Sequence, residues 1–206
     1  MIGESGAGKT TLAKLLCGIE KPTDGIVRLD EAEIFKWKKT DLAPSIGYLP
    51  QNIELFGGSI MSNISRFEEP NTDYLRDACE KAGILDLFDS FLEGKDPYID
   101  ADSLSISNGM KQKIGLARAY YGNPTLIVLD EPTSRLDSFS ENKFLESIKL
   151  LKQEGACVII ITHNSKIIRN SDNILMIGAG EQKMHDSTQN AFSKIRNAVE
   201  RGRKKT

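Results

Sequence analysis

A glycine-rich stretch near the beginning of the chain has the residue types and the spacing of a phosphate-binding loop. It runs from Gly3 to Thr11 and fits the pattern G-x-x-x-x-G-K-[ST] at every fixed position. Backbone N–H groups of such a loop surround phosphate oxygens, and its glycines permit close approach and positive φ. We expect Lys9 to reach the β- and γ-phosphates and the Thr10 hydroxyl to bind Mg²⁺. The residues expected to contact the nucleotide are Gly3, Glu4, Ser5, Gly6, Ala7, Gly8, Lys9, Thr10 and Thr11.

Two carboxylates, Asp130 and Glu131, directly follow the apolar run 126–129. A buried strand would deliver both to its carboxyl end, where α/β proteins bind ligands. We expect Asp130 to hold Mg²⁺ through its water shell, and Glu131 to orient and deprotonate an attacking water. Taken alone, such a pair is more often a capping pair at the start of a loop. Its combination with a phosphate-binding loop favours the catalytic role.

Two further polar residues stand at predicted strand ends. His163 follows the apolar run 157–161, in a position from which a γ-phosphate contact would come. Gln51 ends the segment 47–51, at the entrance to a helical region, and could couple the nucleotide to that region. Either residue alone would be an ordinary polar strand end. We predict that both belong to the catalytic set, and that Gln51 also joins Thr10 and Asp130 at the metal.

The elements that must position these residues are those of an α/β protein. The short, β-branched runs 126–129 and 157–161 predict buried parallel strands, with a helix over 140–154 between them. The predicted fold is a P-loop NTPase core with a mainly parallel sheet and an inserted α-helical subdomain. Its predicted parts are the ATPase core at 1–50 and 121–185, the helical subdomain at 51–120 and a basic C-terminal tail at 186–206. Further strands are predicted at 26–30, 45–49 and 174–177, and further helices at 10–18, 72–82, 84–91 and 111–121.

Composition narrows the function classes. Lys and Arg total 27 against 29 Asp and Glu, a net charge of −2, so the balance predicts no nucleic-acid partner. No apolar run reaches the roughly 18 residues that a membrane span needs. The odd set Cys17, Cys79 and Cys157 lies in apolar contexts, which predicts buried thiols in a reducing cytosol. Residues 193–206 carry six basic side chains against Glu200, which is typical of a solvated helix end and less often of a membrane or partner contact.

The order of these motifs resembles the nucleotide-binding domain of ATP-binding-cassette (ABC) transporters, over residues 3 to about 180. The motifs that carry the resemblance are the phosphate-binding loop, Gln51, Ser107-Asn108-Gly109-Met110, Asp130-Glu131, Ser134-Arg135-Leu136-Asp137 and His163. The stretches 46–56, 60–67 and 116–124 are similar to those of type I secretion ATPases. Those exporters fuse a transmembrane domain to the cassette and move proteins out of Gram-negative bacteria.

The resemblance implies an ATPase in which two cassettes close head-to-tail on two ATP molecules with Mg²⁺. One cassette would supply the phosphate-binding loop and the catalytic set, and the other would supply Ser107 and Gly109, with Asp137 in a loop that touches the opposite cassette. The implied partners are a second copy of the cassette and a transmembrane domain on the same or a separate chain. The implied location is the cytoplasmic face of the inner membrane.

Several positions depart from the family pattern. Asn108 and Met110 stand where the signature loop usually has Gly or Ala and Gln, and Arg135 replaces a usual Ala. Losing one oriented donor at such a site can cost about 3 kcal/mol of transition-state stabilisation. The stretch 98–105 is shorter than expected and lacks the family's Glu-Gly pattern.

These departures leave an alternative to the active exporter ATPase: a degenerate cassette that binds nucleotide weakly without productive hydrolysis. Only Met1 and Ile2 precede the phosphate-binding loop, so we expect an N-terminally truncated piece of a longer protein, with the adenine-stacking aromatic upstream. An ABC ATPase that acts on DNA or ribosomes is disfavoured, because the sequence has neither a coiled-coil insertion nor a basic tract for DNA.

Overall fold

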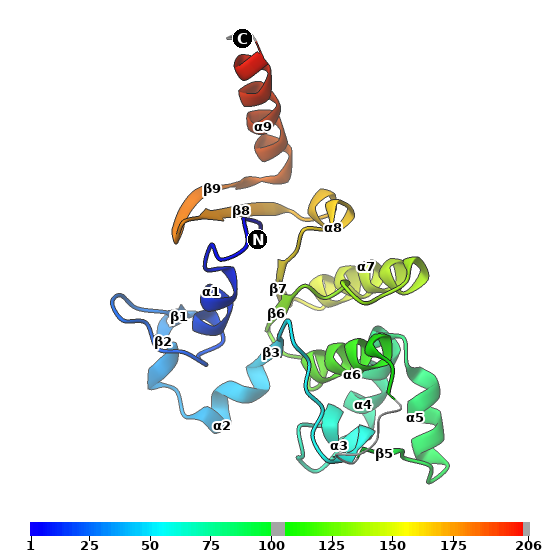
Figure 1. The fold of residues 1–206 in the computed structure, drawn as a ribbon. Helices are drawn as coiled ribbons and strands as arrows, with labels where there is room; N and C mark the ends of the chain where they lie inside the picture. The colour runs from blue at the N-terminus through cyan, green and yellow to red at the C-terminus, as the bar shows by residue number, and fades with distance from the viewer. Residues whose placement is uncertain (100–105, 204–206) are drawn as a thin grey trace.

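The computed structural model describes residues 1–99 and 106–203 and has a mixed α/β fold (Figure 1). The strands are β1 (Arg28–Leu29), β2 (Ala32–Glu33), β3 (Ile46–Leu49), β4 (Gly58–Ser59), β5 (Tyr98–Ile99), β6 (Leu126–Asp130), β7 (Cys157–Ile161), β8 (Asn173–Gly178) and β9 (Glu181–Ser187). The helices are α1 (Lys9–Leu16), α2 (Lys39–Leu42), α3 (Ile60–Ile64), α4 (Thr72–Ala82), α5 (Leu85–Leu92), α6 (Asn108–Tyr120), α7 (Ser138–Gln153), α8 (Ser165–Arg169) and α9 (Thr188–Arg203). Two 3₁₀ turns are η1 (Ile34–Lys36) and η2 (Ala43–Ser45).

A parallel sheet of order β3-β6-β7 lies at the centre of the fold. Every residue of the middle strand β6 is buried, which explains its continuous apolar sequence. The helix α7 connects β6 to β7, as predicted from the strand–helix–strand pattern. These strands confirm the α/β class and the parallel sheet, and they bring the carboxyl ends of β3, β6 and β7 to one edge.

The first two residues of the chain lie between β7 and β8. Ile2 makes a parallel bridge to Met176, where its N–H donates to the Leu175 carbonyl and its carbonyl accepts from the Ile177 N–H, both at 2.9 Å. On the other side, the Thr162 N–H donates to the Met1 carbonyl at 3.2 Å. This two-residue segment therefore joins the parallel sheet to the antiparallel hairpin formed by β8 and β9.

The helices α3 to α6 gather on the opposite side of the sheet from the hairpin (Figure 1). Helix α4 begins at the cap Asn71, whose side chain accepts from the N–H groups of Asp73 and Tyr74 at 3.0 Å each. It ends at Gly83, whose φ of 70° is the left-handed conformation that glycine adopts most readily. Both signals are visible in the sequence, where Asn71 or Thr72 could serve as the cap, and the helix could therefore be predicted to within one residue.

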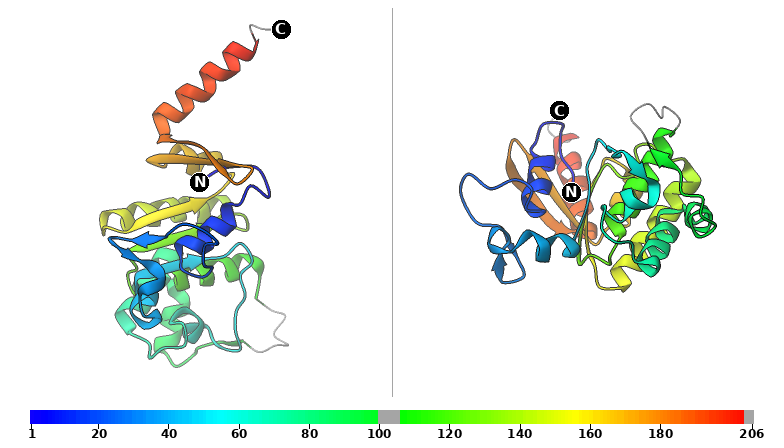
Figure 2. Two further views of the ribbon diagram at one scale, coloured as in Figure 1. Left: turned by 90° about the vertical axis from the view of Figure 1, so that its left-hand side faces the viewer. Right: turned by 90° about the horizontal axis from the view of Figure 1, so that it is seen from below.

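Two apolar cores hold the parts together. The larger core joins the helices α3 to α7 to the sheet through Leu49, Ile127 and Leu129. The smaller core packs α1 against the other side of the sheet through Ala13 and Val128. Helix α9 extends away from both, and projects from the body of the molecule (Figure 2). None of the helices in the described part of the chain is long and apolar enough to cross a membrane.

Some predicted elements differ from the observed ones. The strand expected at 26–30 is reduced to β1, which pairs with the unpredicted β2. The predicted basic tail 186–206 contains the end of β9, which was not predicted, and the helix α9. Residues 204–206 of that tail and residues 100–105 of the stretch 98–105 lie outside the described residues. Cys17 and Cys79 are buried, but the prediction of burial was wrong for Cys157, which is exposed at the start of β7, an edge strand of the three-stranded parallel sheet.

Candidate nucleotide-binding site

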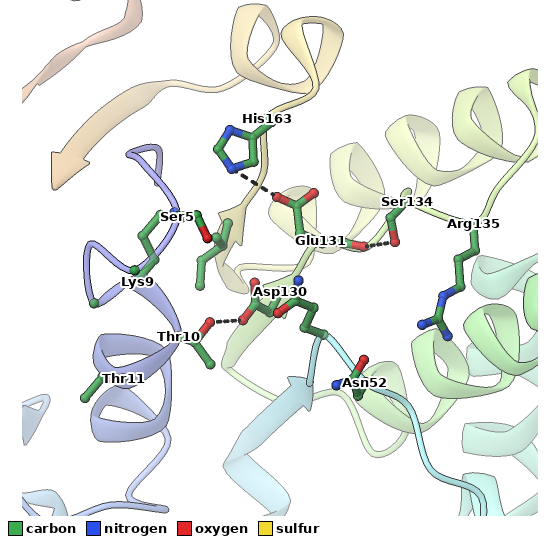
Figure 3. Close-up of a pocket in the computed structure, with 14 residues that line it drawn as sticks. Ser5, Lys9, Thr10, Thr11, Asn52, Asp130, Glu131, Ser134, Arg135 and His163 are labelled. Atoms are coloured by element: carbon green, nitrogen blue, oxygen red, sulfur yellow. Dashed lines mark hydrogen bonds and ion pairs between the residues drawn. The ribbon is translucent and has the colours of Figure 1, made fainter. Parts of the chain in front are cut away.

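A cavity of about 570 Å³ lies where the phosphate-binding loop meets the carboxyl ends of the parallel strands (Figure 3). Its volume is in the range typical of small-molecule sites. The residues that line it are Ser5, Gly6, Gly8, Lys9, Thr10, Thr11, Gln51, Asn52, Asp130, Glu131, Ser134, Arg135, Ile161 and His163. The sheet therefore brings the predicted loop, metal and catalytic residues to one cavity, although they come from four distant parts of the sequence.

The backbone of the phosphate-binding loop requires its glycines. Gly6 and Gly8 have φ values of 76° and 94°, in the left-handed region. A Cβ on Gly3 would lie 2.1 Å from the Ile177 carbonyl oxygen, so the hairpin approaches the loop too closely for any side chain there. Helix α1 follows Gly8 directly and has no side-chain cap. Its first N–H groups are therefore available to an anion in the cavity.

The Lys9 side chain is folded onto the loop that precedes it. Its ammonium donates to the carbonyls of Gly3 at 2.8 Å and Glu4 at 2.7 Å. Gly3 and Glu4 do not line the cavity, and their contribution is to hold Lys9. Ala7 is buried and likewise does not line the cavity. The charge of Lys9 is thus placed at the floor of the cavity by main-chain contacts.

The predicted metal residues Thr10 and Asp130 touch each other. The Thr10 Oγ1 donates to Asp130 Oδ2 at 2.7 Å, and Asp130 is only 2% exposed at the end of β6. Two adjacent oxygens suit Mg²⁺, which commonly binds one or two protein oxygens and takes its remaining ligands from phosphates and water. Within residues 1–99 and 106–203 no group of three or more His, Cys, Asp or Glu side chains could hold a metal alone. Gln51 is exposed and lines the same cavity, and its metal role stays a prediction.

The side chains of Glu131 and His163 point toward each other at the cavity (Figure 3). His163 Nε2 lies 3.7 Å from Glu131 Oε1. Burial raises the pKa of Glu131 above its ordinary value and the charge of Asp130 raises it further, whereas His163 and Lys9 oppose the rise. The Glu131 backbone has a φ of 51°, rare outside glycine, and its N–H donates to the Ile161 carbonyl at 2.9 Å. A carboxylate held in this way can accept a proton from water.

Comparison with known proteins identifies the family of the chain that forms this cavity. Residues 1–134 match the family model described as ABC transporter. The chain belongs to the ABC transporter family. Membership implies nucleotide binding and, for the family's ATP-binding domain in general, ATPase activity.

Individual relatives of this ABC domain are exporters of different kinds. The chain is 35% identical over 196 residues to the type I secretion system ATP-binding protein PrsD of Rhizobium meliloti, covering 95% of this chain and 34% of that protein. It is 31% identical over 189 residues to an ATP-dependent lipid A-core flippase of Burkholderia orbicola, covering 90% and 32%. A solved bacterial Atm1-family ABC exporter with ATP bound matches with a TM-score of 0.82 at 29% identity, covering 94% and 34%. The chain spans about a third of the length of these relatives.

Three further predicted nucleotide contacts, those expected to meet a second cassette, do not line the cavity of this ABC domain either. Ser107 caps α6, where its Oγ accepts from the Met110 N–H at 3.2 Å, and Asp137 caps α7, where it accepts from the Ser140 N–H at 2.7 Å. Gly109 lies in the first turn of α6. A Cβ at this position would make a tight contact of 3.3 Å with the Arg135 carbonyl oxygen. Their contact with a second cassette stays a prediction.

Sequence reasoning missed residues that complete the ABC site. Gln112 is 1% exposed and donates from Nε2 to the Pro132 carbonyl at 2.8 Å, which fixes α6 to the loop after β6. Asn52 and Ser134 line the cavity beside the predicted residues. The position of Asn52 next to Gln51 was the one available signal, because nothing in a helical pattern marks Gln112 as facing a distant carbonyl.

Proposed function

We propose that this chain is the ATP-binding and ATP-hydrolysing cassette of an exporter for type I protein secretion. It would power transport when two copies close head-to-tail on ATP, beneath a transmembrane domain on the same or a separate chain, at the cytoplasmic face of the inner membrane. The observation that carries the proposal is the contact between Thr10 and Asp130 in one cavity with Glu131. It joins the phosphate-binding loop, the metal oxygens and a candidate base.

The chemistry follows from the positions of these side chains. The N–H groups of the loop and of α1 bind the phosphate chain, and the Lys9 ammonium adds a positive charge beside it. Thr10 and Asp130 would hold Mg²⁺, which would supply positive charge beside the phosphates. Glu131 accepts the proton of the attacking water, and His163 keeps the Glu131 carboxylate oriented toward the cavity.

Protein secretion is favoured over lipid transport by the pattern of similarity. The type I secretion relative matches more of the chain, at higher identity, than the lipid A flippase does. The segments 46–56, 60–67 and 116–124 also have the sequence typical of the secretion ATPases. The first of these includes Gln51, which lines the cavity.

Binding of a fluorescent ATP analogue, with and without Mg²⁺, tests the first requirement of the proposal, which is that the cavity binds ATP. Wild type should bind the analogue more tightly with Mg²⁺, and Lys9→Ala should reduce affinity by at least about tenfold, since it removes a charge placed directly at the phosphates. Phosphate release should be measured in the same samples. Equal affinity in wild type and Lys9→Ala would exclude the cavity as the ATP site.

A second candidate, a degenerate cassette without productive hydrolysis, is favoured by one observation. Asn108 and Met110 replace the usual small residue and Gln in the first turn of α6, next to the cap Ser107. Tight ATP binding together with no phosphate release from the wild-type chain would support this second candidate over the first.

A further inference from the structure

Arg135 is the one cation that lines the nucleotide cavity from the loop after β6. In Figure 3 the side chains of Lys9 and Thr10 lie on one side of Glu131, and Arg135 lies on the other. The phosphate-binding loop and this arginine therefore border the cavity from opposite sides. No motif of the family accounts for a positive charge at this position, where the usual residue is Ala.

The guanidinium of Arg135 makes no hydrogen bond or ion pair with the residues that the structure describes, and the side chain is exposed. Two partly buried arginines of the fold are used differently, whereas the exposed Arg76 and Arg169, like Arg135, make no such bond among the described residues. Arg66 donates to the carbonyls of Ala43 and Arg118, and Arg118 donates to those of Glu54 and Asn63. A guanidinium carries five N–H donors and no acceptor, so the group beside the cavity is free to take an anionic oxygen acceptor.

The backbone that presents Arg135 is held in place. The Ser134 N–H and Oγ both donate to the Glu131 carbonyl, at 3.3 Å and 3.0 Å, and the Leu136 N–H donates to the Thr133 carbonyl at 3.2 Å. The start of α6 packs directly beneath, because a Cβ on Gly109 would lie 3.3 Å from the Arg135 carbonyl oxygen. The guanidinium is therefore carried by a turn fixed on both sides.

The charges of the cavity show which ligand group Arg135 would meet. The ammonium of Lys9 is turned toward the carbonyls of Gly3 and Glu4, at the loop end of the cavity. A phosphate chain that begins at the loop and continues past Glu131 would bring its terminal phosphate toward Arg135. We propose that Arg135 binds this terminal phosphate and makes the cavity prefer a nucleoside triphosphate to a diphosphate. This inference rests on the proposed function.

Affinities for Mg·ATP and Mg·ADP, measured by isothermal titration calorimetry on the full chain, test the inference. Arg135→Ala should weaken ATP binding about 3- to 10-fold and change ADP binding less than about twofold, as expected for one exposed charge-assisted contact. Arg135→Lys should recover part of the ATP affinity, because it keeps the charge and loses the planar fork. The matched control is Arg169→Ala on α8. Arg169 is exposed and lies outside the cavity, and its substitution removes the same charge. It should change neither affinity.

The outcomes separate this inference from the proposed function. An unchanged ratio of ATP to ADP affinity in Arg135→Ala overturns the inference, whereas unchanged ATP binding in Lys9→Ala overturns the proposed function. Gel filtration with ATP supplies a further outcome. If Arg135→Ala loses only ATP-dependent dimerisation and keeps the affinity ratio, Arg135 contacts a second copy and the inference is wrong. The difference for ATP should also shrink at high salt, which a purely structural effect would not do.

Discussion

Glu131 occupies an unusual position for a charged residue. Its backbone is left-handed, its N–H is used by the neighbouring strand β7, and its carboxylate is half-buried beside another carboxylate, Asp130. Both the strain and the burial act against stability, and the structure retains them at the cavity. Such features are typical of residues that are selected for chemistry.

Glu131→Gln should therefore keep ATP binding and lose turnover by about 10²- to 10⁴-fold, the usual contribution of a positioned general base. Binding of the fluorescent analogue and release of phosphate measure the two separately. Glu80→Gln, on the exposed side of α4, is the matched control and should leave both unchanged. Hydrolysis at the wild-type rate in Glu131→Gln would show that Glu131 is structural.

The sequence was sufficient to predict which residue types form the site, but not which of these residues contact each other. The four apolar residues before Asp130 place it at a strand end, and the glycine pattern places Lys9 and Thr10 in a loop. The hydrogen bond between Thr10 and Asp130, however, joins residues 120 positions apart. It depends on α1 packing against β6, which no local pattern specifies. The contact of Gln112 with Pro132 depends in the same way on how α6 lies beside β6.

At the scale of elements, the start of α6 combines a helix cap, Ser107, with neighbours that depart from the family pattern. Ser107 still caps the helix, while the exposed Asn108 and the half-buried Met110 replace the residues usual in the family. Because these residues do not line the cavity of their own chain, their effect should be on association between copies.

Changing Asn108→Gly and Met110→Gln together should raise phosphate release and ATP-dependent dimerisation, and should leave ATP affinity in dilute solution unchanged. The gain in rate should be of the order of tenfold or more, because an oriented donor at a phosphate site contributes a few kcal/mol to the transition state. Turnover assays and light scattering measure the two effects. An altered affinity with unaltered dimerisation would place the substitutions in the binding step instead.

A buried lysine ties the helical part of the fold to α7. The Lys81 side chain is 5% exposed, and its ammonium lies 2.6 Å from Asp77 on the same helix and 2.8 Å from Glu154 at the end of α7. Burial alone would lower the pKa of Lys81, but the hydrogen bonds and charges of Asp77 and Glu154 outweigh burial and raise it. The ammonium therefore stays charged and holds both carboxylates.

Lys81→Met should lower the free energy of unfolding by about 1–3 kcal/mol. The effect lies below that of a fully buried pair because the two carboxylates remain partly exposed to water. Urea denaturation measures it. The control is Lys95→Met, which removes a pair between exposed side chains and should cost less than about 1 kcal/mol. Equal losses in the two variants would contradict a special role for Lys81.

At the scale of the whole molecule, the buried strands and the helices could be predicted from the sequence more accurately than the exposed edge of the sheet and the hairpin. The buried β6 is visible in the sequence as an apolar run, and α4 as a helical pattern between Asn71 and Gly83. The helix α7 was predicted from residue 140, two residues late, because the cap Asp137 was not recognised as one. The exposure of Cys157 is not visible in the sequence, because an apolar run predicts a strand without saying what covers its open side. The hairpin strand β9 was missed for a different reason: its sequence is polar and has no apolar run or alternation to mark a strand.

The narrow connection through Met1 and Ile2 also determines how the molecule should open on slow timescales. The main-chain bonds that link β8 to the parallel sheet, among the described residues, run through these two residues, while β6 is paired on both sides. Breaking this connection should release the hairpin as one cooperative unit well before the sheet unfolds. Amide protons of β8 and β9 should then exchange with deuterium much faster than those of β6.

The same opening should respond to nucleotide. Gly3 follows Ile2 directly and lies against the Ile177 carbonyl, so the loop can bind phosphates only while the hairpin is in place. A ligand that binds only the closed form slows exchange by the factor 1 + [ligand]/Kd. Mass spectrometry with saturating Mg·ATP should therefore show deuterium uptake slowing in β8, although no residue of that strand touches the cavity. In that sense the hairpin reports, through its amide protons, whether the site behind Gly3 is filled.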